Sequence, residues 1–304
     1  MAERVLATPV AVSPASYLAL CKPRVVALIV FTAVVGMLLA APDAVPLRAL
    51  LFGSLGIALG AASGAAANHW VDRRIDEIMQ RTQDRPLPSG ELVPNAALAF
   101  AILLGIFSML VLTLFVNHLT ALLTFLSLIG YAVIYTVYLK RSTPMNIVLG
   151  GAAGAAPPVL GWAAVTGTVP TEALLLFLII FVWTPPHFWA LAIKRREEYR
   201  SAGVPMLPVT HGVAFTKLQI LLYTIVLVVV STLPFFIQMS GLIYLSGAIA
   251  LGIGFLRYAI LLYRSDSDAL AMKTFGYSIL YLSLLFGFLL ADHYVRLLVR
   301  SILA

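Results

Sequence analysis

The sequence predicts an all-α integral membrane protein, with about nine transmembrane helices arranged around a cytoplasm-facing cavity. Hydrophobic residues make up 61% of the 304 residues, and charged residues only 11%. The mean hydropathy of +0.99 lies far from that of soluble domains, in which roughly half of the residues are apolar and a quarter are charged. Runs of about 20 apolar residues are long enough to cross a hydrocarbon core as helices.

Nine such runs follow one another along the chain. They cover residues 24–41, 48–69, 95–116, 118–138, 146–166, 171–193, 217–238, 242–263 and 275–296. The external connections are minimal, because VNHLT at 116–120 and IQMSG at 237–241 barely turn the chain. Two cytoplasmic connections, at 70–94 and 194–216, are long and polar. Polar loops at membrane depth are tolerated only where protein buries them or where they line a wet cavity, so these two loops predict the cavity and its caps.

Basic residues orient the helices, because cytoplasmic loops retain Lys and Arg. Of the 20 basic residues, only Arg48, Arg296 and Arg300 fall on the predicted external side. The others are Arg4, Lys22, Arg24, Arg73, Arg74, Arg81, Arg85, Lys140, Arg141, Lys194, Arg195, Arg196, Arg200, Lys217, Arg257, Arg264 and Lys273. We therefore expect a short cytoplasmic N-terminal segment at residues 1–21, an external C-terminus, and a bacterial or archaeal plasma membrane as the location.

The net charge of +7 is explained by this topology and by attraction to anionic membrane lipids. No basic segment is interleaved with a soluble fold, so we do not expect nucleic acid as a partner. The single cysteine, Cys21, excludes an internal disulfide and a cysteine-based metal site. The first 22 residues are a poor transit peptide, and no small-residue cleavage site closes a signal-like apolar run.

The densest polar stretch begins with NHWVDRRID at 68–76. Asn68, Asp72 and Asp76 recur every four residues, which places them on one stripe of a helix. Mg²⁺ is commonly bound by one or two carboxylates together with substrate phosphates, so this stripe predicts a site for a metal diphosphate. A frayed helix end with solvated charges is the alternative. Asn68, however, begins the stripe inside an apolar run, where polar groups are costly and typical of functional sites.

Basic residues in three places are candidates for holding the diphosphate. Arg81 and Arg85 follow the stripe and suit bidentate phosphate contacts. Lys140 and Arg141 end the fourth apolar run, where the positive-inside pattern would also explain them. The segment KRREEYR at 194–200 adds Lys194 as a phosphate ligand and Glu198 as a metal ligand, if the two polar loops face each other. For this last segment alone, an ordinary basic turn at the membrane surface is the preferred interpretation.

An aromatic cluster surrounds one histidine in VWTPPHFWALAI at 182–193. Pro185 and Pro186 are expected to break or kink the sixth helix and to free backbone carbonyl groups. His187 follows this break and lies in the sequence between Trp183 and Trp189. A flat aromatic acceptor or a haem iron would suit this combination, whereas a packing histidine in an interfacial aromatic belt is the plainer alternative.

The same residues resemble the UbiA-type intramembrane prenyltransferases. The segments NHWVDRRID and RTQDRPLPSG are similar to the NxxxDxxxD signature of that family. More narrowly, four segments resemble the protohaem IX farnesyltransferase branch, over about Lys22 to Asp292. They are YLKRSTPMNIVLGGAAGAAPPVLGW, TPPHFWALAI, EEYRSAGVPMLPV and FGYSILYLSLLF.

The resemblance implies one prenyltransferase domain over residues 1–304 that uses Mg²⁺ to transfer farnesyl from farnesyl diphosphate to a vinyl group of haem b. Asn68, Asp72 and Asp76 would then form the metal and diphosphate motif. His187, with Trp183 and Trp189, would contact haem. Glu198 departs from the family's second acidic motif, DxxxD, which puts a second metal site in doubt. The resemblance also implies a haem A synthase or a terminal oxidase as the downstream partner of the product, haem o.

Three other functions remain open on the sequence. A sister enzyme that prenylates a quinone precursor would share the donor site. A polytopic transporter would also have many helices, but transporters place their substrate sites near the bilayer midplane, whereas the polar clusters here lie at one face. A haem chaperone would have no need of a metal-diphosphate stripe.

Overall fold

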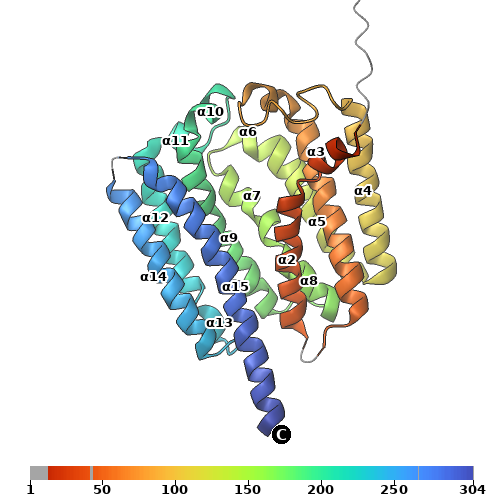
Figure 1. Cartoon of the computed structure of the whole chain (residues 1–304), viewed down its shortest axis with the longest axis vertical. Helices are drawn as coiled ribbons and strands as arrows, with labels where there is room; N and C mark the ends of the chain where they lie inside the picture. The colour runs from red at the N-terminus through yellow and green to blue at the C-terminus, as the bar shows by residue number, and fades with distance from the viewer. Residues whose placement is uncertain (1–12, 42–43, 266, 304) are drawn as a thin grey trace, which may run out of the picture.

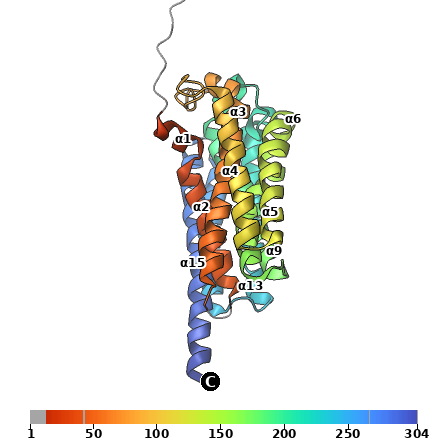
Figure 2. The same cartoon turned by 90° about the vertical axis from the view of Figure 1, so that its right-hand side faces the viewer.

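The computed structural model describes residues 13–41, 44–265 and 267–303, and every regular element in this part of the chain is a helix. Nine helices among the described residues are long and apolar enough to cross a membrane, so the predicted all-α fold with nine spans is confirmed. They run along one common axis and form a compact bundle (Figures 1 and 2). The predicted cytoplasmic Arg4 lies outside the described residues.

The nine spans are built from fourteen elements. They are α2 (Pro23–Ala40); η1 (Ala49–Gly53) with α3 (Ser54–Ile78); α4 (Pro94–Phe115); α5 (His118–Ile129) with η2 (Gly130–Leu139) and α6 (Lys140–Ser142); α7 (Asn146–Ala155) with α8 (Pro157–Thr166); α9 (Thr171–Lys194); α12 (Gly212–Val230) with α13 (Leu233–Phe236); α14 (Leu242–Arg264); and α15 (Ala269–Leu303). Three short helices lie between spans or ahead of them: α1 (Pro14–Leu20), α10 (Arg196–Ser201) and α11 (Leu207–Thr210).

The short helices gather at one end of the bundle, which we call the polar end, and the C-terminus lies at the other (Figure 1). The N-terminal helix α1 is also at the polar end, as an odd number of spans requires. α15 has 35 residues, which at 1.5 Å per residue gives about 52 Å and exceeds the 40–45 Å of a bilayer with its headgroups. Its last turns therefore project beyond the other helices (Figure 2).

α3 continues to Ile78, so the charged residues of NHWVDRRID are helical, as the spacing of the stripe predicted, and the first polar loop begins at Met79. A break at Pro185 and Pro186, one of the two predicted alternatives, is wrong, because α9 runs without interruption from Thr171 to Lys194. Proline removes a backbone donor and its ring crowds the carbonyl four residues earlier, but membrane helices tolerate this where neighbouring helices support them.

Small residues allow the helices to approach closely. The backbones of α2 and α8 cross in direct contact: a Cβ atom on Gly36 would overlap the carbonyl oxygen of Pro158, and one on Gly161 would overlap that of Ala33. Small residues at helix crossings are typical of membrane bundles, where backbones pack without a hydrophobic driving force. This crossing lies in the half of α2 that is remote from the polar end.

Hydroxyl groups add bonds between α3 and α4. The hydroxyl of Ser63 donates to the carbonyl oxygen of Ala101 at 2.7 Å, and that of Ser108 donates to the carbonyl oxygen of Gly56 at 2.7 Å. In hydrocarbon, such bonds satisfy hydroxyl groups that would otherwise have no partner. α3 is thereby held firmly while it presents its polar stripe at the polar end.

Candidate active site

The predicted stripe on α3 is buried. Asn68, Asp72 and Asp76 are 5%, 1% and 3% exposed, although they lie within three turns of the end of the helix. The side-chain amide of Asn68 donates to Asp72 Oδ2 at 2.7 Å, so the first two members of the stripe are in direct contact. Buried carboxylates are costly unless they are paired, so the surrounding cations decide whether this arrangement is stable.

The fourth span supplies the first cation. Even-numbered spans cross in the same direction, so α3 and the η2–α6 segment run parallel and successive turns stay in register. Thr136 lies 3.3 Å from the amide nitrogen of Asn68, and one turn further on Lys140 Nζ lies 2.5 Å from Asp72 Oδ2. Arg141 lies 3.9 Å from the other Asp72 oxygen. The structure therefore brings both predicted diphosphate ligands of this span to the stripe.

The first polar loop supplies the second cation by folding back on the end of α3. Arg85 forms an ion pair of 2.7 Å with Asp76, and the hydroxyl of Thr82 donates to the Asp76 backbone carbonyl at 3.0 Å. Arg81 is exposed at the surface of the loop. Burial raises the pKa of Tyr199, and the positive charge of Arg81 opposes that rise, which places Arg81 near α10.

Lys22 is the third cation, and the sequence did not single it out as a site residue. Its ammonium donates to Asn68 Oδ1 at 2.6 Å across 46 residues of sequence. Lys22 adopts a left-handed backbone conformation with φ of 49° immediately before Pro23, which costs roughly 1–3 kcal/mol for a residue other than glycine. Burial, followed by the charge of Arg85, lowers the pKa of Lys22 to about 7. A strained and desolvated lysine that contacts the stripe is typical of a functional site.

The donor set fits a metal that is shared with a substrate. Among the residues with described positions, no three His, Cys, Asp or Glu side chains form a complete metal site. The stripe instead offers one amide and two carboxylates, and Asp72 Oδ1 is buried without a hydrogen-bond partner. Mg²⁺ retains several waters and takes its remaining ligands from substrate phosphates, so an incomplete protein shell with an oxygen that accepts no hydrogen bond suits it.

The second polar loop does not reach the stripe through Lys194 or Glu198. α9 ends at Lys194 and α10 starts at Arg196, so the two residues do not share one continuous helical face. Glu198 pairs with Arg195 at 2.6 Å, and its second oxygen is buried without a partner. Within the described part of the chain, no hydrogen bond or ion pair joins Lys194 or Glu198 to Asn68, Asp72 or Asp76. Their roles stay predictions.

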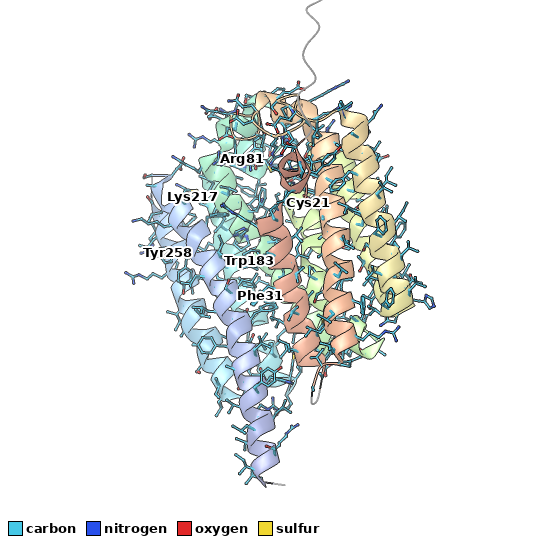
Figure 3. The ribbon with its side chains drawn as sticks, turned by 45° about the vertical axis from the view of Figure 1, so that its right-hand side comes forward. Cys21, Phe31, Arg81, Trp183, Lys217 and Tyr258 are labelled. Carbon is cyan, nitrogen blue, oxygen red and sulfur yellow. The ribbon has the colours of Figure 1, made fainter. Side chains whose placement is uncertain are left out.

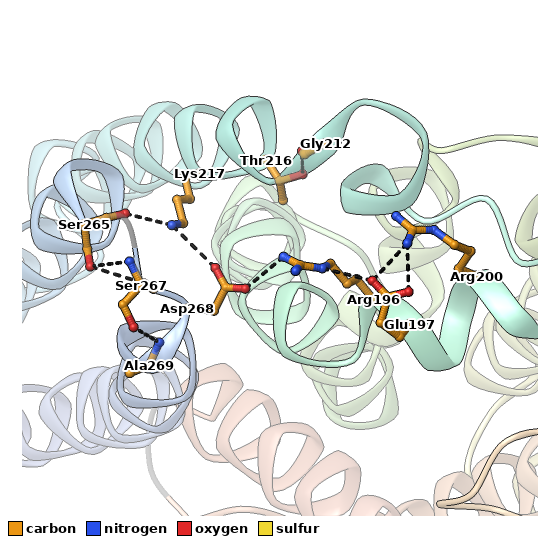
Figure 4. A network of polar contacts seen from close by, with 10 residues as sticks. All are labelled: Arg196, Glu197, Arg200, Gly212, Thr216, Lys217, Ser265, Ser267, Asp268 and Ala269. Atoms are coloured by element: carbon orange, nitrogen blue, oxygen red, sulfur yellow. Dashed lines mark hydrogen bonds and ion pairs between the residues drawn. The ribbon is translucent and has the colours of Figure 1, made fainter.

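Other charges of this loop bind the turn between α14 and α15. Arg196 forms an ion pair of 2.9 Å with Asp268, and Lys217 of α12 donates to the Ser265 carbonyl oxygen at 2.8 Å (Figure 4). Glu197 pairs in turn with Arg196 at 3.2 Å. This network agrees with the plainer interpretation of KRREEYR as a basic surface turn.

The two polar loops nevertheless meet through apolar side chains. Met79 is buried in one cluster with Tyr199, Val204 and Met206, which belong to the second loop or to α10. The two polar loops therefore pack against each other next to the end of α3, and the cytoplasm-facing cavity beneath them stays a prediction.

His187 lies deeper in the bundle, in a separate pocket. Its ring stacks on Trp183 at 4.1 Å and on Phe275 of α15 at 4.5 Å between centroids. A cavity of about 120 Å³ lies beside it, lined by α2, α9 and α15. Phe31 of α2 also lines this cavity and lies next to Trp183 in the middle of the bundle (Figure 3).

Ser278 determines which ring nitrogen of His187 carries the proton. Its hydroxyl donates to the carbonyl oxygen of Phe275 at 2.6 Å, so the oxygen is left to accept from His187 Nδ1 at 2.7 Å. Because a neutral imidazole carries one proton, Nε2 then has a free lone pair. This is the tautomer that binds a metal through Nε2, with Nδ1–H held by a second group. Ser278 was not singled out from the sequence as a site residue.

Trp189, by contrast, lies on another face of α9. It is six residues from Trp183, which is about 240° around a helix. It is 1% exposed and packs edge-on against Tyr223 of α12 at 5.4 Å. The structure does not bring Trp189 to the pocket that holds His187 and Trp183, and its predicted contact with haem stays a prediction.

Comparison with known proteins places this arrangement in a family. The family model described as UbiA prenyltransferase family matches residues 29–288. The fold is similar to that of a digeranylgeranylglyceryl phosphate synthase, with a TM-score of 0.78, 20% identity and coverage of 92% of this chain and 98% of that one. It is also similar to a UbiA homolog from Archaeoglobus fulgidus bound to DMAPP and Mg²⁺, with a TM-score of 0.69, 20% identity and coverage of 92% and 99%. The chain belongs to the UbiA prenyltransferase family.

Two relatives are much more similar in sequence. A protein of Thioalkalivibrio sulfidiphilus named protoheme IX farnesyltransferase is 64% identical over 282 residues, which cover 93% of each chain. A protein of Nitrosococcus oceani with the same name is 65% identical over 279 residues, which cover 92% of this chain and 93% of that one.

Proposed function

We propose that the chain transfers a farnesyl group from farnesyl diphosphate to a vinyl group of haem b, with addition of water, to give haem o and diphosphate. Binding of the donor, farnesyl diphosphate, is supported by the buried stripe of Asn68, Asp72 and Asp76, in which each member contacts a cation. The acceptor is supported by the name protoheme IX farnesyltransferase of relatives that are more than 60% identical over nearly their whole length.

On the donor side, Asp72 and Asp76 would hold Mg²⁺ with the amide oxygen of Asn68. When bound, Mg²⁺ supplies positive charge that stabilises the leaving diphosphate. The UbiA homolog from Archaeoglobus fulgidus was solved with DMAPP and Mg²⁺, which supports this choice of metal. Lys140 and Arg85 lie beside the carboxylates and would hold diphosphate oxygens, as preorganised charges do in a dry site.

The reaction is then a balanced substitution. The allylic C–O bond of farnesyl diphosphate breaks, and both electrons leave with the diphosphate. The electron-rich vinyl group of haem forms the new C–C bond to the farnesyl carbon. Water adds to the resulting cation beside the porphyrin and loses a proton, which leaves a hydroxyethylfarnesyl arm. The buried cap of the two loops would keep other water away from the farnesyl cation.

On the acceptor side, His187 offers Nε2 to the haem iron, and Ser278 holds the ring in that tautomer. The pocket residues Leu28 to Thr32 lie six to ten residues along α2 from Lys22, which is about 9–15 Å below the stripe. The cavity of about 120 Å³ is smaller than the roughly 300–1,000 Å³ of ligand pockets, so it must widen to admit a porphyrin.

The proposed setting is a bacterial inner membrane with the polar end in the cytoplasm. The basic residues of the loop after α3, of α6 and of the segment after α9 gather at that end and support this orientation, because cytoplasmic loops retain Lys and Arg. Diphosphate substrates made in the cytoplasm would then reach the stripe directly.

The test is a product assay on the full chain. Membranes that contain it are incubated with haem b, farnesyl diphosphate and Mg²⁺, and the haem is examined by mass spectrometry, with EDTA in a parallel sample. We expect farnesylated, hydrated haem that disappears with EDTA. A prenylated quinone precursor with unchanged haem would favour the sister enzyme, and movement of a substrate without any product would favour a transporter. Either result contradicts the proposal.

A further inference from the structure

In this structure every oxygen-bearing member of the stripe is already engaged by a cation of the protein. One cation comes from the start of α2, one from the end of the fourth span and one from the first polar loop. The three pairs are Lys22 with Asn68 at 2.6 Å, Lys140 with Asp72 at 2.5 Å, and Arg85 with Asp76 at 2.7 Å. The side chains that would bind a metal are therefore paired with the side chains that would bind a diphosphate.

We infer that Lys22, Lys140 and Arg85 close the site until metal and diphosphate arrive together, when each cation leaves its partner on α3 for the diphosphate. The inference rests on the proposed function for the identity of the anion. It adds Lys22 to the diphosphate site and cooperative binding of the two ligands.

The reason lies in the burial of the pairs. A metal ion that bound alone would displace the cations, and three partly buried positive charges would then lie beside the metal without partners, which is unfavourable. A diphosphate that bound alone would draw the cations away and leave Asp72 and Asp76 unpaired, although these are 1% and 3% exposed. When both ligands bind, every charge has a partner. Each ligand should therefore raise the affinity for the other by the same factor.

Lys22 differs from the other two cations because its partner is a neutral amide. The two carboxylates face these three cations, with Arg141 at 3.9 Å from Asp72 as a fourth cation, so the closed site carries an excess positive charge that attracts an anion. Asn68 Oδ1 is the acceptor for Lys22, and the amide nitrogen of the same side chain donates to Asp72. Lys22 thus also orients Asn68, and loss of its ammonium frees a metal ligand. It is the cation whose removal should weaken the coupling with least damage to the carboxylates.

The experiment measures metal binding and not turnover. The full chain is purified in lipid nanodiscs, and bound Mn²⁺ is counted by EPR with and without inorganic pyrophosphate. A variant with Asp72→Asn and Asp76→Asn provides the correction for Mn²⁺ that pyrophosphate binds in solution. For the wild type we expect pyrophosphate to raise the Mn²⁺ affinity by about 5- to 150-fold, the usual range of coupling between sites.

Two variants test the role of Lys22. Lys22→Met should strengthen the binding of Mn²⁺ alone and reduce the coupling at least about fivefold. Lys22→Arg keeps the charge and should retain most of the coupling, and Lys22→Gln, which also removes the charge, replaces Lys22→Met if that variant does not fold. Lys273→Met is the matched control, because Lys273 is exposed on α15.

The outcomes separate the inference from the proposed function. If Mn²⁺ binds the wild type equally well with and without pyrophosphate, joint binding is refuted while a metal site remains. If coupling is present but removal of the Lys22 charge leaves it unchanged, the role of Lys22 is refuted. If the wild type binds no Mn²⁺ even with pyrophosphate, the proposed function itself fails.

Discussion

Asp72→Asn should separate the catalytic and the structural roles of the stripe. The substitution keeps the shape of the side chain and removes its charge. Asp72 is 1% exposed, and its closest cation is Lys140 at 2.5 Å, whose side chain is 13% exposed. Breaking a buried ion pair costs about 3–5 kcal/mol, and the partial exposure of Lys140 places the expected loss near the lower limit. For a chain of this length, about 3 kcal/mol lowers the melting temperature by roughly 6 °C.

The expected loss of activity is larger. Removal of one preorganised charge that stabilises a transition state lowers kcat by about 10²- to 10³-fold. The assay is farnesyl transfer to haem, together with thermal unfolding of the purified protein. The matched variant combines Asp72→Asn with Lys140→Met and removes both members of the pair. It should recover most of the lost stability and none of the activity.

Two results would refute this reasoning. If Asp72→Asn keeps its activity within about threefold, Asp72 does not stabilise the transition state, because the expected loss is at least about 10²-fold. If the double variant is no more stable than the single one, the ion pair with Lys140 does not explain the cost of the substitution.

Two further predictions concern the packing of the bundle and the deeper pocket. Gly161→Ala should clearly lower the melting temperature of the protein, because the added Cβ would meet the backbone of Ala33, which cannot rotate away. Gly276→Ala is the control and should leave the melting temperature unchanged, because its Cβ would meet no neighbour. Equal melting temperatures of the two variants would contradict the close crossing. Ser278→Ala should shift the absorbance spectrum of haem added to the protein, because the position of the proton on the His187 ring is no longer fixed. Ser278→Thr keeps the hydroxyl group and should restore the wild-type spectrum. An unchanged spectrum in Ser278→Ala would remove Ser278 from the site.

The sequence predicted the nine spans well, because each one is an uninterrupted apolar run. The spacing of the stripe also predicted that α3 continues through charged residues to Asp76. The cations that neutralise Asp72 and Asp76 come from other elements. Those partners depend on the tertiary structure and leave no signal in the local composition. The prolines of α9 misled the prediction for a related reason, because packing by neighbouring helices supports the helix through Pro185.

For the candidate site, periodicity within one helix was reliable and proximity in the sequence was not. Asn68, Asp72 and Asp76 lie on one stripe because the spacing of four follows the helical repeat. Trp189 was grouped with His187 for its closeness in sequence, although helix geometry turns it toward α12. Lys22 could not be found from the sequence, because a left-handed residue before Pro23 and a contact across 46 residues bring it to the stripe.

The crossing of α2 and α8 divides α2 into a half that contacts α8 and a half that lies closer to the polar end. The backbone of α2 is in contact with α8 around Gly36, whereas its other half lines the pocket beside His187 with Phe31 and reaches the stripe with Lys22. From Gly36 to Lys22 the helix extends about 21 Å, so a tilt of about 10° around the crossing would move Lys22 by about 4 Å. A tilt of α2 that widened the pocket would therefore also change the position of Lys22 relative to Asn68. One helix thus links the proposed acceptor pocket to the proposed donor site.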